Sequence, residues 1–442
     1  MDFDFTRRQF LATIGAGLAS SALPSLGDGS VVRKGHLVTD RKINIACIGC
    51  GGKGESDVGA MSGENIVGLC DVDFNRGAPQ FQAHPEAAIF RDWREMLLCL
   101  DEQIDAVVVS TPDHMHFPPA MLAMELGKHV YVQKPMAHTV TEARILREQA
   151  RLHNVVTQMG NQGHSNEGTR LLKEWVEAGV IGEVREVHIW TNRPIWAQDR
   201  EVPTDIRPVP PTLDWNRWLG VAEWRPYCHG YLPGEWRGWW DFGTGALGDM
   251  GCHTMDATFW ALNLGAPTRV SAHVEGGSEQ SCPKGSIVTY EFPARGKLPP
   301  VVVKWHDGCC RPPRPAQLEE GIEMPESGQL LFGSKGTIMD GTDYCENPHL
   351  IPRSANRAFR AHRPPKTLPR IPNGHDQNWL DAIRGKIAAP CSNFEHAGPL
   401  AEMVLLGAAA VRARASFNWN TETLTCDNPV AQRYIDKTYR AF

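Results

Sequence analysis

The stretch INIACIGCGGKG, residues 43–54, decides the fold class of this chain. It joins an apolar run directly to a glycine turn, and a second apolar run, 66–70, ends in Asp71, 22 residues after Gly49. This order of strand, glycine turn, helix, strand and acid is typical of a dinucleotide-binding unit. The alternative is an ordinary glycine-rich loop, and the flanking strands together with Asp71 favour the functional interpretation.

Each glycine of the turn has a physical task. Gly49 permits the tight turn, Gly51 lets the backbone approach a pyrophosphate, and Gly54 lets helix and strand pack closely. The helix N-terminus then offers unpaired N–H groups and a positive dipole end to the phosphates. Gly52 and Lys53 complete the predicted phosphate-binding turn.

The acid that follows the second strand carries cofactor preference. A carboxylate at this place, here Asp71, accepts hydrogen bonds from a ribose 2′-hydroxyl and repels a 2′-phosphate. Asp73 adds a second negative charge, whereas Arg76 is close enough to favour a phosphate. On balance the sequence predicts NAD rather than NADP.

Residues 1–26 have the features of an export signal. Paired arginines at 7–8 are followed by Phe-Leu at 10–11 and by a small-residue apolar stretch too short to span a membrane. We therefore expect a twin-arginine signal and linker over 1–35 and a periplasmic or extracellular protein; the alternative is a chance arginine pair. Because this route carries folded proteins, we expect the dinucleotide to be bound before export.

Composition fits a two-domain enzyme, because 442 residues exceed what one core usually supports. A formal net charge of −6 gives no case for nucleic acid, and we expect no membrane contact beyond the export signal. Cys47 and Cys50 form a C-x-x-C, but they fall on a predicted strand and in the glycine turn. We interpret them as buried thiols and predict no metal.

The first half of the chain alternates strands and helices, which predicts an α/β domain with a doubly wound parallel sheet over residues 40–160. Ligands of such sheets bind beyond the carboxyl ends of the strands, where Thr111-Pro112 and Gln133-Lys134-Pro135 lie. The expected strands are 43–48, 66–70, 106–111, 129–132 and 155–159, and the expected helices are 118–127 and 140–153.

After about residue 183 the pattern changes and predicts a largely antiparallel sheet. We expect it to belong to an α+β domain over 161–430, followed by a tail, 431–442. A helix over 399–414 is expected to pack back on the body. The expected strands are 184–191, 268–275, 286–292, 300–305 and 329–333.

These motifs together resemble the Gfo/Idh/MocA family of glucose-fructose oxidoreductase and inositol dehydrogenase. The glycine turn, Thr111-Pro112 with His116, Lys134-Pro135 and the run GDMGCHTMD at 248–256 occur in family order. The resemblance covers about residues 40–430 and implies a Rossmann domain plus a domain with an open, mostly antiparallel sheet, through which homodimers or homotetramers form. It also implies that Thr111, Pro112, His116 and Lys134 contact the dinucleotide. The family's usual Glu-Lys-Pro begins with Gln133 here, which leaves open how Lys134 is held.

The residue types in these motifs fit carbinol oxidation. Asp249 and His253 are four residues apart, so on a helix they share a face, and a carboxylate can orient an imidazole and support its proton. We expect His253 to be the acid/base, Lys134 to stabilise alkoxide character, and Asp249 to bind a sugar hydroxyl as well. For an isolated Asp-x-x-x-His, a helix cap or a core histidine is the alternative, and the family pattern favours catalysis. Asp256 is expected to pack or cap.

Further substrate-binding candidates come from two places. Asn161 and His164 follow the last predicted strand of the first domain, and Trp196 and Trp239 lie in the tryptophan-rich part of the second. Indole faces suit sugar C–H faces, although most of these tryptophans are expected to anchor loops, and His164 is equally compatible with a surface position. Other residues that either reach the site or belong to turns and strands are Asp113, His114, His306 and Asp307.

The sequence thus predicts an exported NAD-dependent oxidoreductase acting on a sugar, glycoside or polyol. A second interpretation is an NAD-dependent glycosidase that works by transient oxidation, elimination and re-reduction. A third is a non-catalytic dinucleotide-bound sugar sensor, against which the presence of Lys134, Asp249 and His253 argues.

Overall fold

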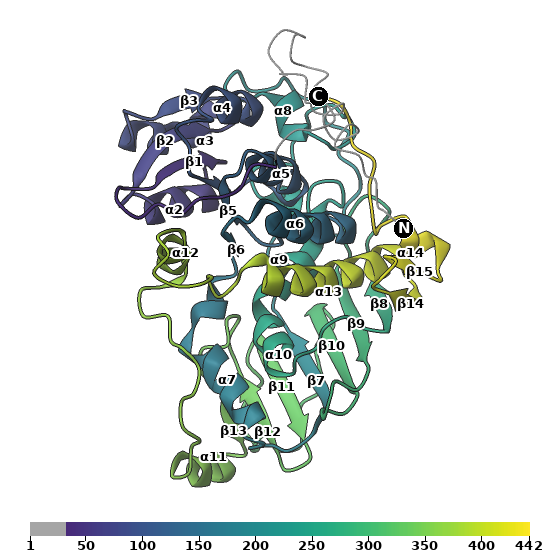
Figure 1. The fold of residues 1–442 in the computed structure, drawn as a ribbon. Helices are drawn as coiled ribbons and strands as arrows, with labels where there is room; N and C mark the ends of the chain where they lie inside the picture. The colour runs from purple at the N-terminus through teal and green to yellow at the C-terminus, as the bar shows by residue number, and fades with distance from the viewer. Residues whose placement is uncertain (1–31) are drawn as a thin grey trace.

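The computed structural model describes residues 32–442, which form two α/β domains stacked end to end (Figure 1). The predicted twin-arginine segment falls within residues 1–31, outside the described residues. Among residues 32–442, no helix has the length and apolar character that crossing a lipid bilayer requires.

The first domain is built on a six-stranded sheet in the order β3-β2-β1-β4-β5-β6, in which every strand pair is parallel. β4 reads Ala-Val-Val-Val and is buried at all four positions, because helices cover both faces of the sheet. This confirms the predicted doubly wound sheet. The strands are β1 Asn44–Ile48, β2 Asn65–Cys70, β3 Ala88–Phe90, β4 Ala106–Val109, β5 His129–Val132 and β6 Thr157–Met159.

The helices of this domain connect successive parallel strands. The expected helices 118–127 and 140–153 are present as α5 and α6, each within two residues of the predicted bounds. The strand expected over 106–111 ends at Val109, because Pro112 lacks an N–H and precedes a short 3-10 helix, η1 Asp113–Met115. The helices are α2 Lys53–Ala60, α3 Phe74–Ala83, α4 Trp93–Cys99, α5 Phe117–Glu125 and α6 Val140–His153.

The glycine turn between β1 and α2 depends on the absence of side chains. Gly49 has a φ of 82°, in the region that favours glycine. A Cβ at Gly51 would lie 2.9 Å from the Cβ of Arg76, and a Cβ at Gly54 would overlap the carbonyl oxygen of Gly49. The backbone of the turn therefore packs directly against Arg76 and Gly49, with no space for a side chain at Gly51 or Gly54.

A pair of glycines on α2 provides a matched test of this packing. Gly54→Ala should lower the free energy of unfolding by about 1–3 kcal/mol or more, because the new methyl group meets rigid backbone. Gly59→Ala, on the same helix with nothing within 4 Å of its Cβ, should be neutral or stabilising by about 0.5–1 kcal/mol. Urea unfolding followed by circular dichroism measures both; equal effects of the two substitutions would contradict the close packing.

The second domain is built on a nine-stranded sheet in the order β13-β12-β11-β7-β10-β9-β8-β14-β15. All neighbours in it are antiparallel except β7 and β10, so the expected mostly antiparallel sheet is observed. The strands are β7 Val184–Trp190, β8 Arg269–Glu275, β9 Gly285–Phe292, β10 Val301–Gly308, β11 Gly328–Gly333, β12 Gly336–Asp340, β13 His349–Ile351, β14 Ser416–Asn420 and β15 Thr425–Cys426.

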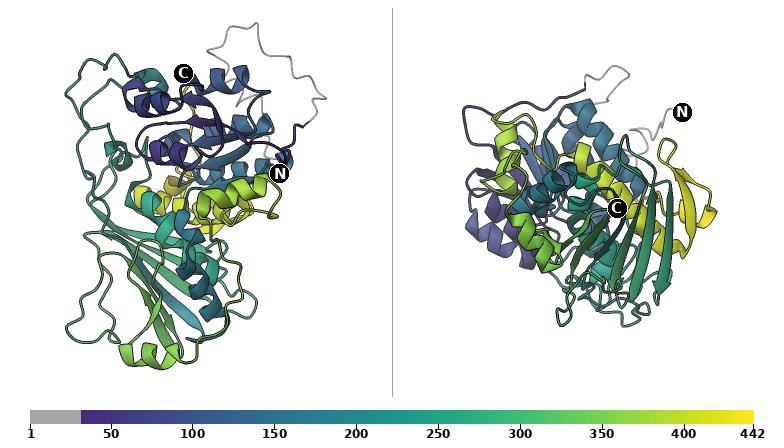
Figure 2. Two further views of the ribbon diagram at one scale, coloured as in Figure 1. Left: turned by 90° about the vertical axis from the view of Figure 1, so that its left-hand side faces the viewer. Right: turned by 90° about the horizontal axis from the view of Figure 1, so that it is seen from below.

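Helices cover one face of this sheet. Buried side chains such as Val303 and Trp305 of β10 pack in one core with helical residues such as Val404. The long helix α13 lies between the first domain and the second sheet (Figures 1 and 2) and begins at Phe394, earlier than the expected 399. The helices of this domain are α7 Glu167–Glu177, α8 Trp215–Leu219, α9 Gly245–Thr254, α10 Asp256–Ala261, α11 Arg353–Arg360, α12 His375–Ile383, α13 Phe394–Ala413 and α14 Pro429–Gln432, with 3-10 turns η2 Gln162–Ser165 and η3 Glu235–Gly238.

The other face of the sheet carries polar and charged groups. Lys304 forms an ion pair with Glu186 at 2.8 Å, and both side chains are at least a third exposed. An open face of this kind is compatible with association of two copies. The homodimer or homotetramer expected from the family resemblance stays a prediction.

Two late segments of the chain return to the first domain. Trp379 on α12 is fully buried against Ile45 and Tyr131 of the first sheet. In the tail, Lys437 forms an ion pair with Glu142 of α6 at 2.9 Å. Residues from α12 and from the tail therefore pack against the first domain.

Candidate active site

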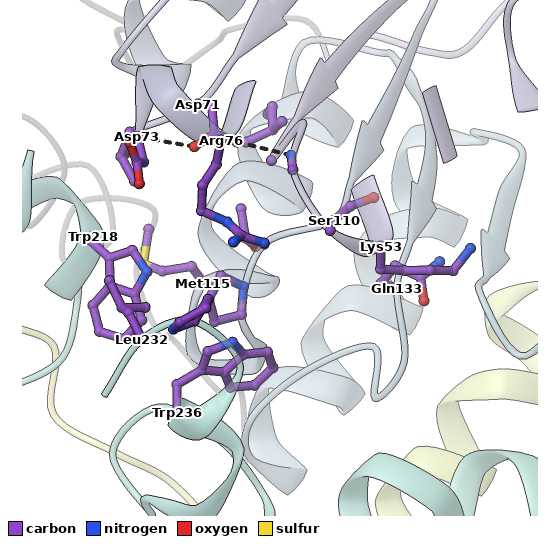
Figure 3. Close-up of a pocket in the computed structure, with 18 of the residues that line it drawn as sticks. Lys53, Asp71, Asp73, Arg76, Ser110, Met115, Gln133, Trp218, Leu232 and Trp236 are labelled. Atoms are coloured by element: carbon purple, nitrogen blue, oxygen red, sulfur yellow. Dashed lines mark hydrogen bonds between the residues drawn. The ribbon is translucent and has the colours of Figure 1, made fainter. Parts of the chain in front are cut away.

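A cavity of about 410 Å³ opens at the carboxyl ends of β1, β2, β4 and β5, where ligands of parallel sheets bind (Figure 3). The glycine turn and Asp71 of the first domain line one side, and the second domain contributes large apolar side chains together with Arg217 and Arg237. Of the residues predicted to bind a dinucleotide, those that line the cavity are Gly49, Gly51, Gly52, Lys53, Asp71, Thr111, Pro112, His116 and Lys134. Gly54 lies behind the turn, packed against Gly49.

Asp71 holds the glycine turn in place. Its Oδ2 accepts hydrogen bonds from the backbone N–H groups of Cys50 at 2.8 Å and Gly51 at 3.2 Å. Its Oδ1 accepts one from the N–H of Asp73 at 2.9 Å, and burial raises the pKa of the carboxyl. Because each carboxylate oxygen has two lone pairs, Oδ1 keeps capacity for a ribose hydroxyl. The role as a turn clamp adds to the predicted role toward the cofactor.

The cradle fits a dinucleotide. Gly51 and Gly52 line the cavity without side chains, so a pyrophosphate can approach the backbone, and no side chain caps the N-terminus of α2 that follows them. The hydroxyl of Thr111 is buried without a hydrogen-bond partner among the described residues. Arg76 lies in the same cavity, where its guanidinium adds positive charge beside the turn.

His116 joins the two loops that close the cavity. Its Nδ1 lies 2.6 Å from the carbonyl oxygen of Pro135, and its Nε2 lies 2.7 Å from that of Thr111. The imidazole thereby ties the loop after β4 to the loop after β5. His116 belongs to the cavity wall, as the sequence predicts, and it also orders the loop that carries Lys134.

Lys134 meets the carboxylate of Asp249, which comes from α9 in the second domain. The Lys134 ammonium donates to Asp249 Oδ1 and to the Asp249 carbonyl oxygen, both at 2.8 Å. Arg237 also donates to Asp249 Oδ1, at 3.0 Å. Burial alone would raise the pKa of the Asp249 carboxyl, but the two cations hold it well below its usual range. Arg237 was not among the sequence candidates, because a lone arginine in a loop carries no motif.

His253 lies on the same helix, one turn after Asp249. No hydrogen bond joins these two side chains, so the expected carboxylate–imidazole pair is absent from the described residues; Asp249 is engaged by Lys134 and Arg237 instead. His253 is 5% exposed and packs edge-on against the ring of Tyr344, with centroids 4.9 Å apart. Burial and the nearby Lys134 charge lower the pKa of His253 to about 3. Its Nδ1 is buried without a partner, so the neutral ring keeps a free site for a proton or a hydrogen bond.

Beyond His253, a buried carboxylate joins two imidazoles. Asp256 Oδ2 lies 2.8 Å from Nδ1 of His164, and Oδ1 lies 2.7 Å from Nε2 of His396. The three side chains form a compact cluster within which a metal ion would find donor atoms, although each contact is satisfied as a hydrogen bond. His164 is 2% exposed, so it is not the surface residue that the sequence left open.

The other predicted substrate residues lie in different surroundings. Asn161 is fully buried; its Oδ1 accepts from the Ser392 hydroxyl at 2.5 Å, and its Nδ2 has no partner among the described residues. Trp196 is half-buried and lies 5.8 Å from the guanidinium of Arg237. Trp239 is 1% exposed and donates its indole N–H to Gly230, so it packs in a loop core.

The remaining open positions are held by contacts within the fold, and of these Asp113 also lines the cavity. The Asp113 carboxylate accepts from the Thr244 hydroxyl at 2.6 Å, and both nitrogens of His114 lie against backbone carbonyl oxygens of Trp218 and Phe242. These contacts attach the loop after β4 to the second domain. His306 and Asp307 lie within β10, where the Asp307 carboxylate accepts from Ser286 and Trp305.

Gln133, which replaces the family's glutamate, is held by a carboxylate. Its Nε2 donates to both oxygens of the buried Asp57, at 2.9 and 3.1 Å. Asp57 also accepts from Lys53 at 2.5 Å and from the Ser110 hydroxyl at 2.6 Å. An amide suits this position, because a glutamate would place a second carboxylate against Asp57.

Gln133→Glu should therefore destabilise the protein by roughly 3 kcal/mol at pH 8. Burial and Asp57 would raise the pKa of the new carboxyl in the folded state, so the loss should shrink as the pH falls toward 5 and the group takes up a proton. Gln133→Met, which removes the hydrogen bonds without adding charge, is the control and should show no such pH dependence. Urea midpoints at pH 5 and pH 8 measure this; a loss independent of pH in Gln133→Glu would contradict the charge argument.

Comparison with known proteins agrees with this geometry. Residues 43–161 match the Gfo/Idh/MocA family model described as oxidoreductase family, NAD-binding Rossmann fold. Residues 167–299 match the companion model described as oxidoreductase family, C-terminal alpha/beta domain. Together the two matches span more than half of the chain.

Curated relatives include dehydrogenases and a glycosyl hydrolase. D-Glucoside 3-dehydrogenase of Escherichia coli is 26% identical over 49% of this chain and 52% of its own length. Levoglucosan dehydrogenase of Pseudarthrobacter phenanthrenivorans is 27% identical over 37% of this chain and 34% of its own length. A glycosyl hydrolase family 109 protein of Solibacter usitatus is 26% identical over 76% of this chain and 74% of its own length. The chain thus spans about half or less of the first two relatives.

Solved structures share the fold. The WlbA dehydrogenase from Chromobacterium violaceum, in complex with NADH and UDP-GlcNAcA, superposes with a TM-score of 0.61 at 18% identity, covering 87% of this chain and 98% of the other. A levoglucosan dehydrogenase in complex with NADH and L-sorbose gives a TM-score of 0.58 at 16% identity, covering 86% and 99%. At these identities the likeness concerns the fold.

Proposed function

The chain belongs to the Gfo/Idh/MocA oxidoreductase family, and from this premise we propose that it oxidises a carbinol carbon of a sugar, glycoside or polyol by hydride transfer to tightly bound NAD. The observation that carries this proposal is the set of Lys134, Asp249 and a neutral, buried His253 beside the dinucleotide cavity. When bound, NAD supplies the hydride acceptor. The residues of this chain supply positioning and proton transfer.

In this proposal, Lys134 stabilises the oxygen of the substrate hydroxyl that reacts. It lines the dinucleotide cavity while its ammonium is held by Asp249, so its charge has a defined place next to the cofactor. A fixed cation there stabilises the negative charge that develops on a substrate hydroxyl as its carbon is oxidised. Arg237 shares the charge of Asp249, which leaves net positive charge around the site.

In this proposal, His253 accepts the proton of the substrate hydroxyl. With a pKa of about 3 its ring is neutral at physiological pH, so it is ready to accept a proton rather than to donate one. The low pKa comes from burial and from the charge of Lys134; a substrate alkoxide placed between the two groups would favour the protonated ring. Tyr344 packs against His253 and restricts its orientation.

We also propose that residues 1–26 are an export signal and that export and the bound cofactor are connected. Free NAD is scarce outside the cytoplasm, so an exported enzyme that released NADH in each cycle would stall. Retention of the dinucleotide solves this, provided that a second substrate takes the hydride or that the product takes it back. The clamped glycine turn and a cavity lined by both domains support retention.

A second candidate function is NAD-dependent glycoside hydrolysis, which the aligned glycosyl hydrolase family 109 protein favours. In that reaction the sugar is oxidised, the leaving group is eliminated, water adds, and the hydride is returned, so no net oxidation remains. Both reactions would use the same bound dinucleotide, and the presence of Lys134 favours the oxidoreductase. Only the product separates them.

Product analysis without added cofactor tests the proposal. Protein purified without NAD should release nicotinamide dinucleotide on denaturation and should turn over free sugars or glycosides without free NAD. A keto sugar identified by mass spectrometry would support the oxidoreductase, whereas an unoxidised sugar freed from a glycoside would support the hydrolase. Empty protein whose product depends strictly on added NAD would contradict the bound cofactor, and no turnover of any carbohydrate would contradict the enzyme function.

His253→Ala should lower the chemical rate by about two to four orders of magnitude, because the proton acceptor is lost. Release of NADH should change little, since His253 does not line the dinucleotide cavity. His362→Ala, an exposed histidine at the end of α11, is the matched control. Single-turnover kinetics measures the rate, and a near-normal rate in His253→Ala would remove this residue from the mechanism.

A further inference from the structure

The dinucleotide cavity has a second side that the glycine turn does not explain. Opposite the polar cradle lie Trp218, Leu232 and Trp236, which we call the aromatic wall (Figure 3). All three come from the segment between β7 and α9, in the second domain. Leu232 and Trp236 are only half-buried, although they are large apolar side chains. Their unburied surface faces the cavity.

The segment that carries the wall is docked on the end of β2. The N–H of Asp214 donates to the carbonyl oxygen of Val72 at 2.8 Å, and the N–H of Phe74 donates to that of Thr212 at 3.1 Å. Leu213 forms a β-bridge with Asp73 and also lines the cavity. The attachment therefore flanks Asp71, the residue positioned for the adenosine ribose.

The wall is rigid. Trp218 stacks on Trp215 with centroids 4.9 Å apart and planes 7° apart, and Trp215 donates its indole N–H to the carbonyl oxygen of Arg225. Trp236 lies 4.3 Å under the guanidinium of Arg237, which is fixed by Asp249. A wall held in this way can pack against a flat ring at little cost in side-chain entropy.

The chemistry of the two sides matches the two parts of an adenosine diphosphate group. Backbone N–H groups, Lys53 and Arg76 suit the pyrophosphate, whereas an apolar wall beside the ribose-binding carboxylate suits the adenine ring. We propose that the aromatic wall of the second domain covers the adenosine half of the dinucleotide and thereby slows its release. The inference rests on the proposed binding of NAD and adds residues to that site.

Cofactor release measures this directly. Protein loaded with NADH is mixed with excess NAD, and the loss of bound NADH fluorescence gives the dissociation rate. Leu232→Ala and Trp236→Ala should each raise that rate by about tenfold or more, because each removes a face that packs on the ring. Trp224→Ala is the matched control from the same segment: Trp224 is 65% exposed, lies outside the wall and should leave the rate unchanged.

Binding of a cofactor fragment, ADP-ribose, tests which half of the cofactor the wall contacts. ADP-ribose, which lacks nicotinamide, should raise the thermal unfolding midpoint of the unsubstituted protein more than that of Leu232→Ala or Trp236→Ala. Faster NADH release with an undiminished ADP-ribose shift would overturn the adenosine assignment. Unchanged NADH release in both variants would overturn the wall itself.

Two further comparisons distinguish a folding defect from the loss of the wall, and failure of the wall from failure of the proposed function. Trp236→Phe retains a ring and should keep most of the slow release; if Trp236→Ala lacks the native circular dichroism spectrum, Leu232→Ala and Trp236→Phe decide. Fast NADH release from the unsubstituted protein would contradict the tight retention in the proposed function. In that case the ratio of variant to unsubstituted rates still decides whether the wall contacts the cofactor.

Discussion

The carboxylate of Asp249 is the contact on which the site depends. It accepts hydrogen bonds from Lys134, in the loop after β5, and from Arg237, in η3 of the second domain. A loop of the first domain therefore meets two neighbouring elements of the second domain, η3 and α9, at one buried charge. Because an unpaired buried anion is costly, the Asp249 carboxylate requires these cations, and its ion pair with Lys134 holds the two domains together at the cavity.

This charge balance shapes the chemistry. The Asp249 carboxylate forms ion pairs with Lys134 and Arg237 and does not hydrogen-bond His253. Burial and the Lys134 charge then keep the imidazole neutral. In the function that we propose, the cation stabilises the oxygen of the substrate hydroxyl and the neutral base receives its proton.

The cost of placing two buried carboxylates side by side also explains why Gln133 replaces the family's glutamate. The amide donates to the buried Asp57, which Lys53 and Ser110 also contact. Lys134 is thus positioned by the second domain, through Asp249, rather than by its sequence neighbour. The substitution in the Glu-Lys-Pro motif is compatible with an intact site because the two residues have separate partners.

The sequence by itself determined the first sheet, the glycine turn, the mostly antiparallel second sheet and nine of the residues that line the cavity, because these follow from local patterns: apolar runs, glycine spacing and strand ends. It could not place Arg237, the aromatic wall or the Gln133–Asp57 contact, because these join segments that no periodicity relates. It also paired Asp249 with His253 from their helical spacing, whereas the fold gave Asp249 to two cations from other segments. Spacing on a helix determines which side chains share a face. Only the tertiary structure determines which charged side chains from other segments, here Lys134 and Arg237, lie against that face and form hydrogen bonds with it.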